Sequence, residues 1–383
     1  MTDTTLTIEF QRALKLFYTI SKLLGLPFDK NSEEKKNKCV NKIIISGYIS
    51  IFIVGFLYSI NVILLISLRR SEKTIGALAL NYLFMYFSNI FSLLSINWKK
   101  RNVQLLLNRL CNLDNLLVEK RRSYLYKCSR THCMIYLATA LIFNVVISCT
   151  NSSTGNFDIF SSILHMSSNV FSAGLGLQLS VLVRMIQMRY AECAQIMDQL
   201  TNKTHRLGNH ATRNVHVISS HLDCINVLKF MCTELFECVQ LYNSIFGFTI
   251  IMISLHMFVL EVNCLDLIIY SFRVYNLSNC HLYVNTVFAL SVGFPALLII
   301  GYFSALCHRT SEEVTKIVVK IHKVLIYSDV GHGDTRDLKM LLKRLRDMKL
   351  HFTACGLFTV NLRYLGTFIS GVIMYLLILI QIK

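Results

Sequence analysis

Long apolar segments recur along the chain, and segments rich in Lys and Arg separate them. An α-helix needs about 20 apolar residues to cross the hydrocarbon core of a bilayer. The runs show no alternation of apolar and polar positions, so helices rather than strands are expected. The pattern predicts seven transmembrane helices, at residues 43–67, 74–96, 133–149, 160–183, 241–262, 282–306 and 364–382.

The composition supports this interpretation. Of the 383 residues, 54% are hydrophobic and 16% are charged, and there are only two prolines. A soluble chain of this length would need more charge on its surface and would divide into several domains. The predicted fold class is therefore an all-α membrane protein, with residues 1–383 forming a single seven-helix domain. Its 13 cysteines include no Cys-x-x-Cys pair, which argues against a zinc or disulfide framework.

The distribution of positive charge predicts the orientation in the membrane. Of the 39 Lys and Arg residues, 34 lie in or directly beside the segments 1–41, 98–130, 188–240 and 307–362. Because Lys and Arg are retained on the cytoplasmic side, we expect the N-terminus in the cytoplasm and the C-terminus outside. The segment before the first apolar run is charged throughout, so no cleavable signal peptide is expected.

The cytoplasmic segments are long and patterned. Apolar residues at helical spacing predict two amphipathic helices, at about 307–327 and 336–360, with a turn between them. These helices would extend the bundle into the cytoplasm as anchor helices. Their apolar faces would pack on each other or build a subunit interface, and the sequence leaves both arrangements open.

The two predicted outer loops contain candidate modification sites. Asn151 and Asn276 head Asn-x-Ser/Thr sequences there and are predicted glycosylation sites. Cys264 and Cys280 lie in the last outer loop, where they could form a disulfide, with Cys149 as a competing partner.

Several other functions are disfavoured by the sequence. His205, His210, His216 and His221 are five or six residues apart, whereas ligands on one helix face need spacings of three or four, so no metal site is expected. No cofactor or catalytic motif is found, which argues against an enzyme. The basic runs follow the positive-inside tendency and require no nucleic acid.

Other classes of membrane protein also have several spans. A G-protein-coupled receptor would have the opposite orientation. A multi-span secondary transporter or membrane enzyme remains the alternative.

The last apolar segment carries one polar group near its end, Gln381. Ser370, Met374, Leu377 and Gln381 are spaced so that they share one face of a helix. Gln381 could be hydrated by lipid headgroups at the end of the helix. Alternatively, several copies of the helix could surround a pore, with an apolar lining and a ring of Gln381 amides.

The same segment resembles the last helix of insect gustatory receptors, which carries Thr-Tyr, five apolar residues and Gln-Phe. Tyr375 and Gln381 keep this spacing, while Met374 and Ile382 replace the outer two residues. The resemblance extends to the seven spans, the cytoplasmic N-terminus and the long inner loops. It therefore covers most of the chain.

The resemblance implies a tastant-gated cation channel in the plasma membrane of sensory neurons. Such a channel is a multi-pass homotetramer or heterotetramer with other gustatory receptor subunits, surrounded by membrane lipids, and the last helix of each subunit lines the pore. By analogy, Gln381 and Ile382 would form the gate, Met374 and Leu377 would lie deeper in the pore, and Tyr375 would belong to the same pore segment.

In this family the small-molecule ligand occupies a pocket in the outer half of each subunit. Side chains at that depth that offer rings or hydrogen bonds are Tyr82, Tyr86, Asn144, His165, His256, Glu261, Tyr283 and Asn285. Sugar receptors of the family usually carry an acidic residue directly after the motif tyrosine, and Leu376 stands there. A bitter or other small organic compound is therefore favoured as the ligand.

Overall fold

The computed structural model of the protein describes residues 15–26, 35–69, 73–117, 159–207, 215–274, 280–327, 332–347 and 350–382, with isolated positions between 127 and 138. Almost all of these residues are helical. The helices are α2 (Lys15–Leu23), α3 (Lys35–Arg69), α4 (Lys73–Trp98), α5 (Lys100–Asn115), α7 (Ile159–Leu207), α8 (Val215–Val274), α9 (Cys280–Tyr327), α10 (His332–Asp347) and α11 (Leu362–Ile382).

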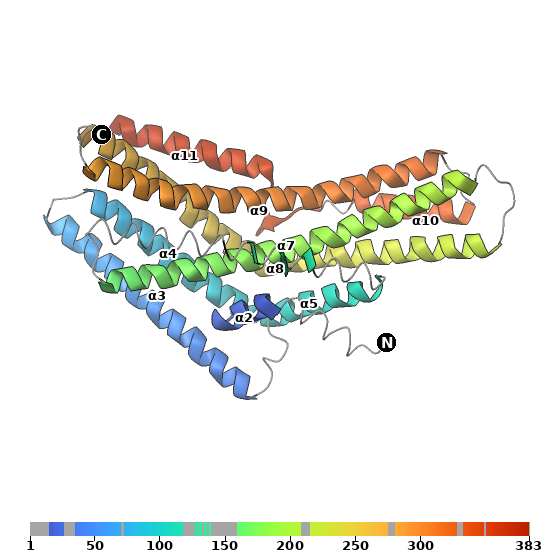
Figure 1. Ribbon diagram of the computed structural model, residues 1–383, viewed down its shortest axis with the longest axis horizontal. Helices are drawn as coiled ribbons and strands as arrows, with labels where there is room; N and C mark the ends of the chain where they lie inside the picture. The colour runs from blue at the N-terminus through green and yellow to red at the C-terminus, as the bar shows by residue number, and fades with distance from the viewer. Residues whose placement is uncertain are drawn as a thin grey trace.

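Three long helices run the length of the molecule (Figure 1). Helices α7, α8 and α9 contain 49, 60 and 48 residues, far more than the roughly 20 that cross a bilayer. Helix α9 continues through Pro295, which helices within membranes tolerate. Each of these helices therefore has both a membrane-crossing part and a part that extends beyond the membrane.

The described helices cover the predicted spans, except for 133–149, which lies outside the described residues apart from isolated positions. Within the described part of the chain, four helices are long and apolar enough to cross a membrane, at Ile43–Ile63, Ser167–Leu200, Ile225–Ile269 and Val292–Ile326. A shorter apolar helix follows at Leu362–Ile378. The protein thus has the several apolar helices expected of a multi-pass membrane protein.

The segment 188–240, expected to be an inner loop, is helical over all of its described residues. Helices α7 and α8 extend through it, and the buried side chains there are Cys193, Met197 and Leu200 on α7 and Leu228, Met231 and Leu235 on α8. These apolar side chains recur at helical spacing, which is the physical reason that the helices continue.

Of the two predicted anchor helices, the first is present in the structure and the second is shorter than predicted. Residues 307–327 are helical as the last part of α9, but the second helix does not reach residue 360. Helix α10 ends at Asp347 and lies at the opposite end of the molecule from the C-terminus of α11 (Figure 1). The chain then forms a short antiparallel hairpin of β1 (Thr353–Ala354) and β2 (Phe358–Thr359).

The hairpin is held by its turn and by helix α8. Cys355 and Gly356 have φ angles of 50° and 76°, a left-handed conformation that breaks a helix. The side-chain amide of Asn243 donates to the carbonyl of His351 at 2.8 Å and accepts from the N–H of Thr353 at 2.9 Å. Asn243 thus bonds to this segment as a neighbouring strand would, which explains why the predicted helix gives way to a hairpin.

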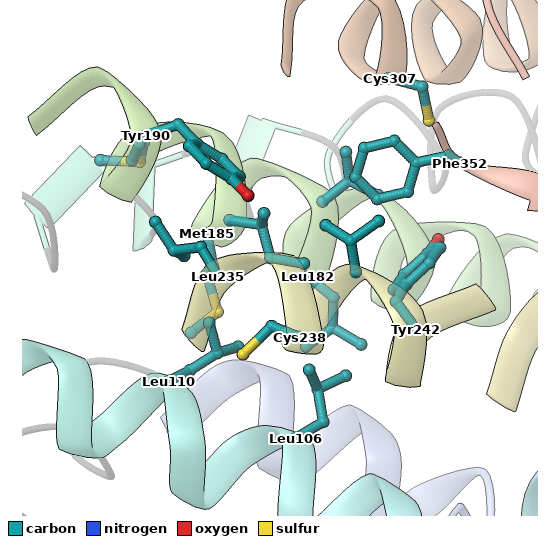
Figure 2. Close-up of a cluster of buried hydrophobic side chains, with 14 of the residues drawn as sticks. Leu106, Leu110, Leu182, Met185, Tyr190, Leu235, Cys238, Tyr242, Cys307 and Phe352 are labelled. Atoms are coloured by element: carbon teal, nitrogen blue, oxygen red, sulfur yellow. The ribbon is translucent and has the colours of Figure 1, made fainter. Parts of the chain in front are cut away.

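A dense apolar core lies where the hairpin meets the long helices. Figure 2 shows side chains from α5, α7, α8 and α9 converging with Phe352, which immediately precedes the hairpin. The rings of Tyr242 and Phe352 meet edge to face, with centroids 5.3 Å apart. Both side chains are fully buried. Burying a large apolar side chain stabilises a fold by about 1.5–3 kcal/mol, so this core fixes the hairpin against α8.

Helix α5 is joined to its neighbours by ion pairs. Arg189 of α7 donates to Asp114 of α5 through two nitrogens, at 2.9 and 2.6 Å, and also to the carbonyl of Met185. The side chains of Arg189 and Asp114 are 2% and 0% exposed. Arg109 pairs with Glu234 and Glu237 of α8 in a more exposed setting. The buried pair fixes the position of α5 against α7.

Candidate functional site

The start of helix α11 is attached to the rest of the molecule by Asn361 and Tyr364. The side-chain oxygen of Asn361 accepts from the N–H of Tyr364 at 2.9 Å, which caps the first turn. The Tyr364 hydroxyl donates to Ser254 of α8 at 2.8 Å, and its ring stacks on Phe358 of β2 with centroids 4.9 Å apart. The hairpin and α8 therefore set the position of α11.

Helix α11 has one buried and one exposed face. Phe368 and Val372 are buried against α8 and α9, and the ring of Phe258 contacts both Phe368 and Tyr375. Met374 and Leu377 are 67% and 54% exposed. Ser370, Met374, Leu377 and Gln381 are all exposed, as their common stripe predicts, while the side chain of Ile382 lies outside the described residues.

This exposed face of α11 is largely apolar, and it lies on a helix that carries no charge after Arg363. An apolar face without cover in one chain must meet lipid or another chain. The arrangement leaves the predicted pore residues available to a neighbouring subunit.

Among the predicted ligand residues, Glu261 lies beside Cys264 at a helix crossing. Glu261 and Cys264 of α8 lie where α8 crosses Gly293 of α9: a Cβ atom at Gly293 would lie 3.1 Å from the Glu261 carboxylate and 3.4 Å from Cys264. Glu261 and Cys264 thus meet where α8 crosses α9, and Tyr82 lies on α4, which packs against α8.

Glu261 is buried, and one of its carboxylate oxygens has no hydrogen-bond partner among the described residues. Buried polar atoms in proteins are nearly always hydrogen-bonded, so an exception needs an explanation. A polar group of a bound molecule would satisfy this oxygen. The carboxylate is therefore the described group best suited to bind a ligand at this depth.

The other predicted ligand residues divide into three groups. Tyr86 is buried in an aromatic cluster with Phe52, and Gly55 lies against its ring. His256 of α8 is also buried. Asn144, and the side chains of His165, Tyr283 and Asn285, lie outside the described residues.

The predicted modification sites remain predictions. Asn151 and Asn276 lie outside the described residues, as does the side chain of Cys280. Cys264 is a buried free thiol in the structure. The Cys264–Cys280 pairing therefore also remains a prediction.

A polar group that the sequence interpretation missed joins α4 to α7. Asn89 donates to the Ser168 hydroxyl at 2.6 Å and to the Ser168 carbonyl at 3.2 Å, and it accepts from Ser172 at 2.9 Å. The sequence feature that could have predicted this group is the pair Ser168 and Ser172, which lie four residues apart in an apolar run and so share one helix face. Among the described residues, this group joins α4 to α7 by polar contacts.

We expect Asn89→Ala to destabilise the protein by about 1 kcal/mol, because hydrogen bonds between membrane helices contribute little more than that. Thermal unfolding of the purified protein in detergent measures the effect. Ser172→Ala removes one of the three bonds and should cost less. Equal unfolding temperatures for the wild type and both variants would contradict the role given to Asn89.

The fold is similar to solved structures of an insect olfactory receptor. The insect olfactory receptor OR5 from Machilis hrabei in complex with eugenol has a TM-score of 0.72 at 13% identity, over 98% of this chain and 99% of that chain. A second structure of OR5 has the same TM-score at 10% identity, with the same coverage. Among proteins with curated functions, none matches significantly by sequence.

The family model described as 7tm chemosensory receptor matches residues 14–383, nearly the whole chain. This match agrees with the resemblance found in the last helix and with the several apolar helices of the structure. The chain is therefore a multi-pass membrane protein of the 7tm chemosensory receptor family.

Proposed function

We propose that the protein is a gustatory receptor that works as a tastant-gated cation channel. The observation that carries this proposal is the exposed stripe of α11, which presents Met374, Leu377 and Gln381 away from the rest of the chain. In a chemosensory receptor, such a face on the last helix is suited to line a pore. The Tyr375 and Gln381 spacing favours the gustatory branch over the olfactory one.

One α11 helix cannot enclose a pore, so the channel needs several subunits in closed rotational symmetry. We propose a homotetramer or a heterotetramer with other gustatory receptor subunits. An apolar lining of Met374 and Leu377 can close by dewetting, and Gln381 with Ile382 forms the gate near the outer mouth. The preference for cations comes from the family resemblance.

The ligand pocket is proposed between α4, α8 and α9, around Tyr82 and Glu261. The unpartnered oxygen of Glu261 offers one strong hydrogen-bond acceptor beside the buried apolar cluster of α8 and α9, and small-molecule pockets commonly combine apolar walls with a few polar groups. A bitter or other small organic compound suits this pocket. The receptor would act in the plasma membrane of sensory neurons, with the N-terminus in the cytoplasm, the C-terminus outside and seven helices crossing the membrane.

The test is whole-cell current in cells that express the chain, recorded under G-protein blockade while a panel of bitter compounds and sugars is applied. We expect a ligand-evoked current whose ion preference or rectification changes in Gln381→Ala, because the ring of amides is lost. The control is Leu298→Ala, at a 47% exposed position on α9, which should leave ion preference and rectification unchanged.

Two results would contradict the proposal. The first is a current with identical ion preference and rectification in wild type and Gln381→Ala. The second is a monomeric state of the purified protein in lipid nanodiscs, since one chain cannot form the proposed pore.

A further inference from the structure

A cavity with a volume of about 40 Å³ lies between the three long helices and the start of α11. Its lining includes four hydroxyl groups, and each comes from a different helix: Ser180 of α7, Ser254 of α8, Ser304 of α9 and Tyr364 of α11. The remaining lining residues are apolar or glycine, and none of them is charged. The cavity therefore gathers polar groups at the point where α11 begins.

The hydroxyl of Ser304 has no hydrogen-bond partner among the described residues, and its side chain is completely buried. A helical serine commonly satisfies its hydroxyl by donating to the carbonyl four residues earlier. Ser180 does so, since it donates to the carbonyl of Gly176 at 2.8 Å. Because a buried polar atom is nearly always hydrogen-bonded, Ser304 is expected to bond to a molecule within the cavity.

The other three hydroxyls keep part of their bonding capacity. A hydroxyl group donates one hydrogen bond and can accept two. Ser180 uses its proton for Gly176, and Tyr364 uses its proton to donate to Ser254 at 2.8 Å. The oxygens of Ser180 and Tyr364 can therefore still accept, and Ser254 keeps its own proton. The lining thus offers both donors and acceptors to a bound molecule.

The volume and the lining together favour water as the bound molecule. A water needs about 10–15 Å³ of such volume and two to four polar partners, so the cavity has room for about three. An organic molecule would have to be smaller than most metabolites, and an ion would meet no counter-charge in the lining. Cavities that stay dry in proteins have apolar walls, whereas this one has four hydroxyls.

We propose that this cavity is an internal water site, in which about three ordered water molecules bond to Ser304 and to the hydroxyls of Ser180, Ser254 and Tyr364. These waters satisfy the buried hydroxyl of Ser304 and connect it to its neighbours across the cavity.

The location of the site gives the waters a structural role at the start of α11. The described polar contacts of the first turn of α11 are with Asn361 and with Ser254 of α8. The waters extend these contacts from Tyr364 to Ser304 of α9 and Ser180 of α7. They therefore join the start of α11 to all three long helices, through bonds that can rearrange without a change in backbone conformation.

The test is X-ray radiolysis of the purified full-length protein in detergent, followed by mass spectrometry. Radiolysis of water produces hydroxyl radicals that oxidise adjacent side chains, so an internal water marks buried neighbours that bulk solvent does not reach. We expect oxidation of Ile300, a lining residue that is 6% exposed. Ile321 lies on the same helix, is 0% exposed and is not part of the lining, so it should stay unmodified.

Two variants change the site itself. Ser304→Leu fills the cavity with a branched apolar side chain and should lower the oxidation of Ile300 by about fivefold or more, because no room for water is left. Ser304→Ala keeps the space but removes one polar partner of the waters, and should lower the oxidation about twofold. Ser50→Leu is the matched control at an exposed position of α3, and should leave the oxidation of Ile300 unchanged.

Two results would overturn the proposal. The first is oxidation of Ile300 no greater than that of Ile321 in the wild type. The second is undiminished oxidation of Ile300 in Ser304→Ala and in Ser304→Leu, since Ile300 would then be reached from bulk solvent. Ser304→Ala decides this point where Ser304→Leu fails to fold. The measurement requires no channel opening, so a failure of the channel proposal would appear in the currents and leave the oxidation pattern intact.

Discussion

Asp114→Ala is expected to lower the free energy of unfolding by about 3–5 kcal/mol, because it leaves the Arg189 guanidinium buried without a counter-charge. Both side chains are almost completely inaccessible, and the two nitrogen–oxygen contacts are 2.9 and 2.6 Å. Loss of the pair would detach α5 from α7. Chemical unfolding in detergent micelles, followed by tyrosine fluorescence, measures the change.

The double variant Asp114→Leu with Arg189→Met replaces the ion pair by apolar side chains. It should recover most of the lost stability, since a buried ion pair seldom outperforms a packed apolar pair. Arg109→Ala is the matched control, because its side chain is 27% exposed and exposed ion pairs contribute about 1 kcal/mol or less. If Asp114→Ala is no more damaging than Arg109→Ala, the importance given to the buried pair is wrong.

Gly247→Ala is expected to destabilise the protein by about 1–3 kcal/mol, as overpacking in a close contact does. A Cβ atom at Gly247 would lie 2.6 Å from the backbone nitrogen of Cys355. Backbone cannot rotate away as a side chain can, so the hairpin must move off α8. Because the hairpin leads directly into α11, we also expect a reduced ligand-evoked current at equal surface expression.

Gly366→Ala provides the comparison for that substitution. Gly366 is also a helical glycine, and an added Cβ atom there would meet nothing within 4 Å. Alanine is favoured over glycine in a helix by up to about 1 kcal/mol, so this variant should be as stable as the wild type or more so. Equal unfolding midpoints for Gly247→Ala and wild type would show that the close contact is not needed.

Hydropathy was enough to predict most of the helices. Apolar runs long enough to cross a bilayer correspond to α3, α4, α7, α8, α9 and α11, because helices in a membrane must satisfy their own backbone. The stripe of Met374, Leu377 and Gln381 was also predictable, since helical spacing alone places these residues on one face. The helical extensions of α7 and α8 were missed because His and Asn residues interrupt their apolar pattern.

The hairpin and the buried ion pair depend on contacts between distant parts of the sequence. Two-residue strands are too short to give a period, and Asn243 meets His351 only once the chain is folded. Likewise, Asp114 and Arg189 are 75 positions apart, and each alone is typical of a charged inner segment. Sequence spacing gives no information about such partners.

The length of α8 has a mechanical consequence. At 1.5 Å per residue, its 60 residues follow a helical path of about 90 Å. Asn243 and Gly247, which hold the hairpin, lie close to the midpoint of that path. A tilt of about 2° about this point moves each end by roughly 1.5 Å, in opposite directions. A tilt of α8 about the hairpin contact therefore displaces both ends of the helix more than the hairpin itself.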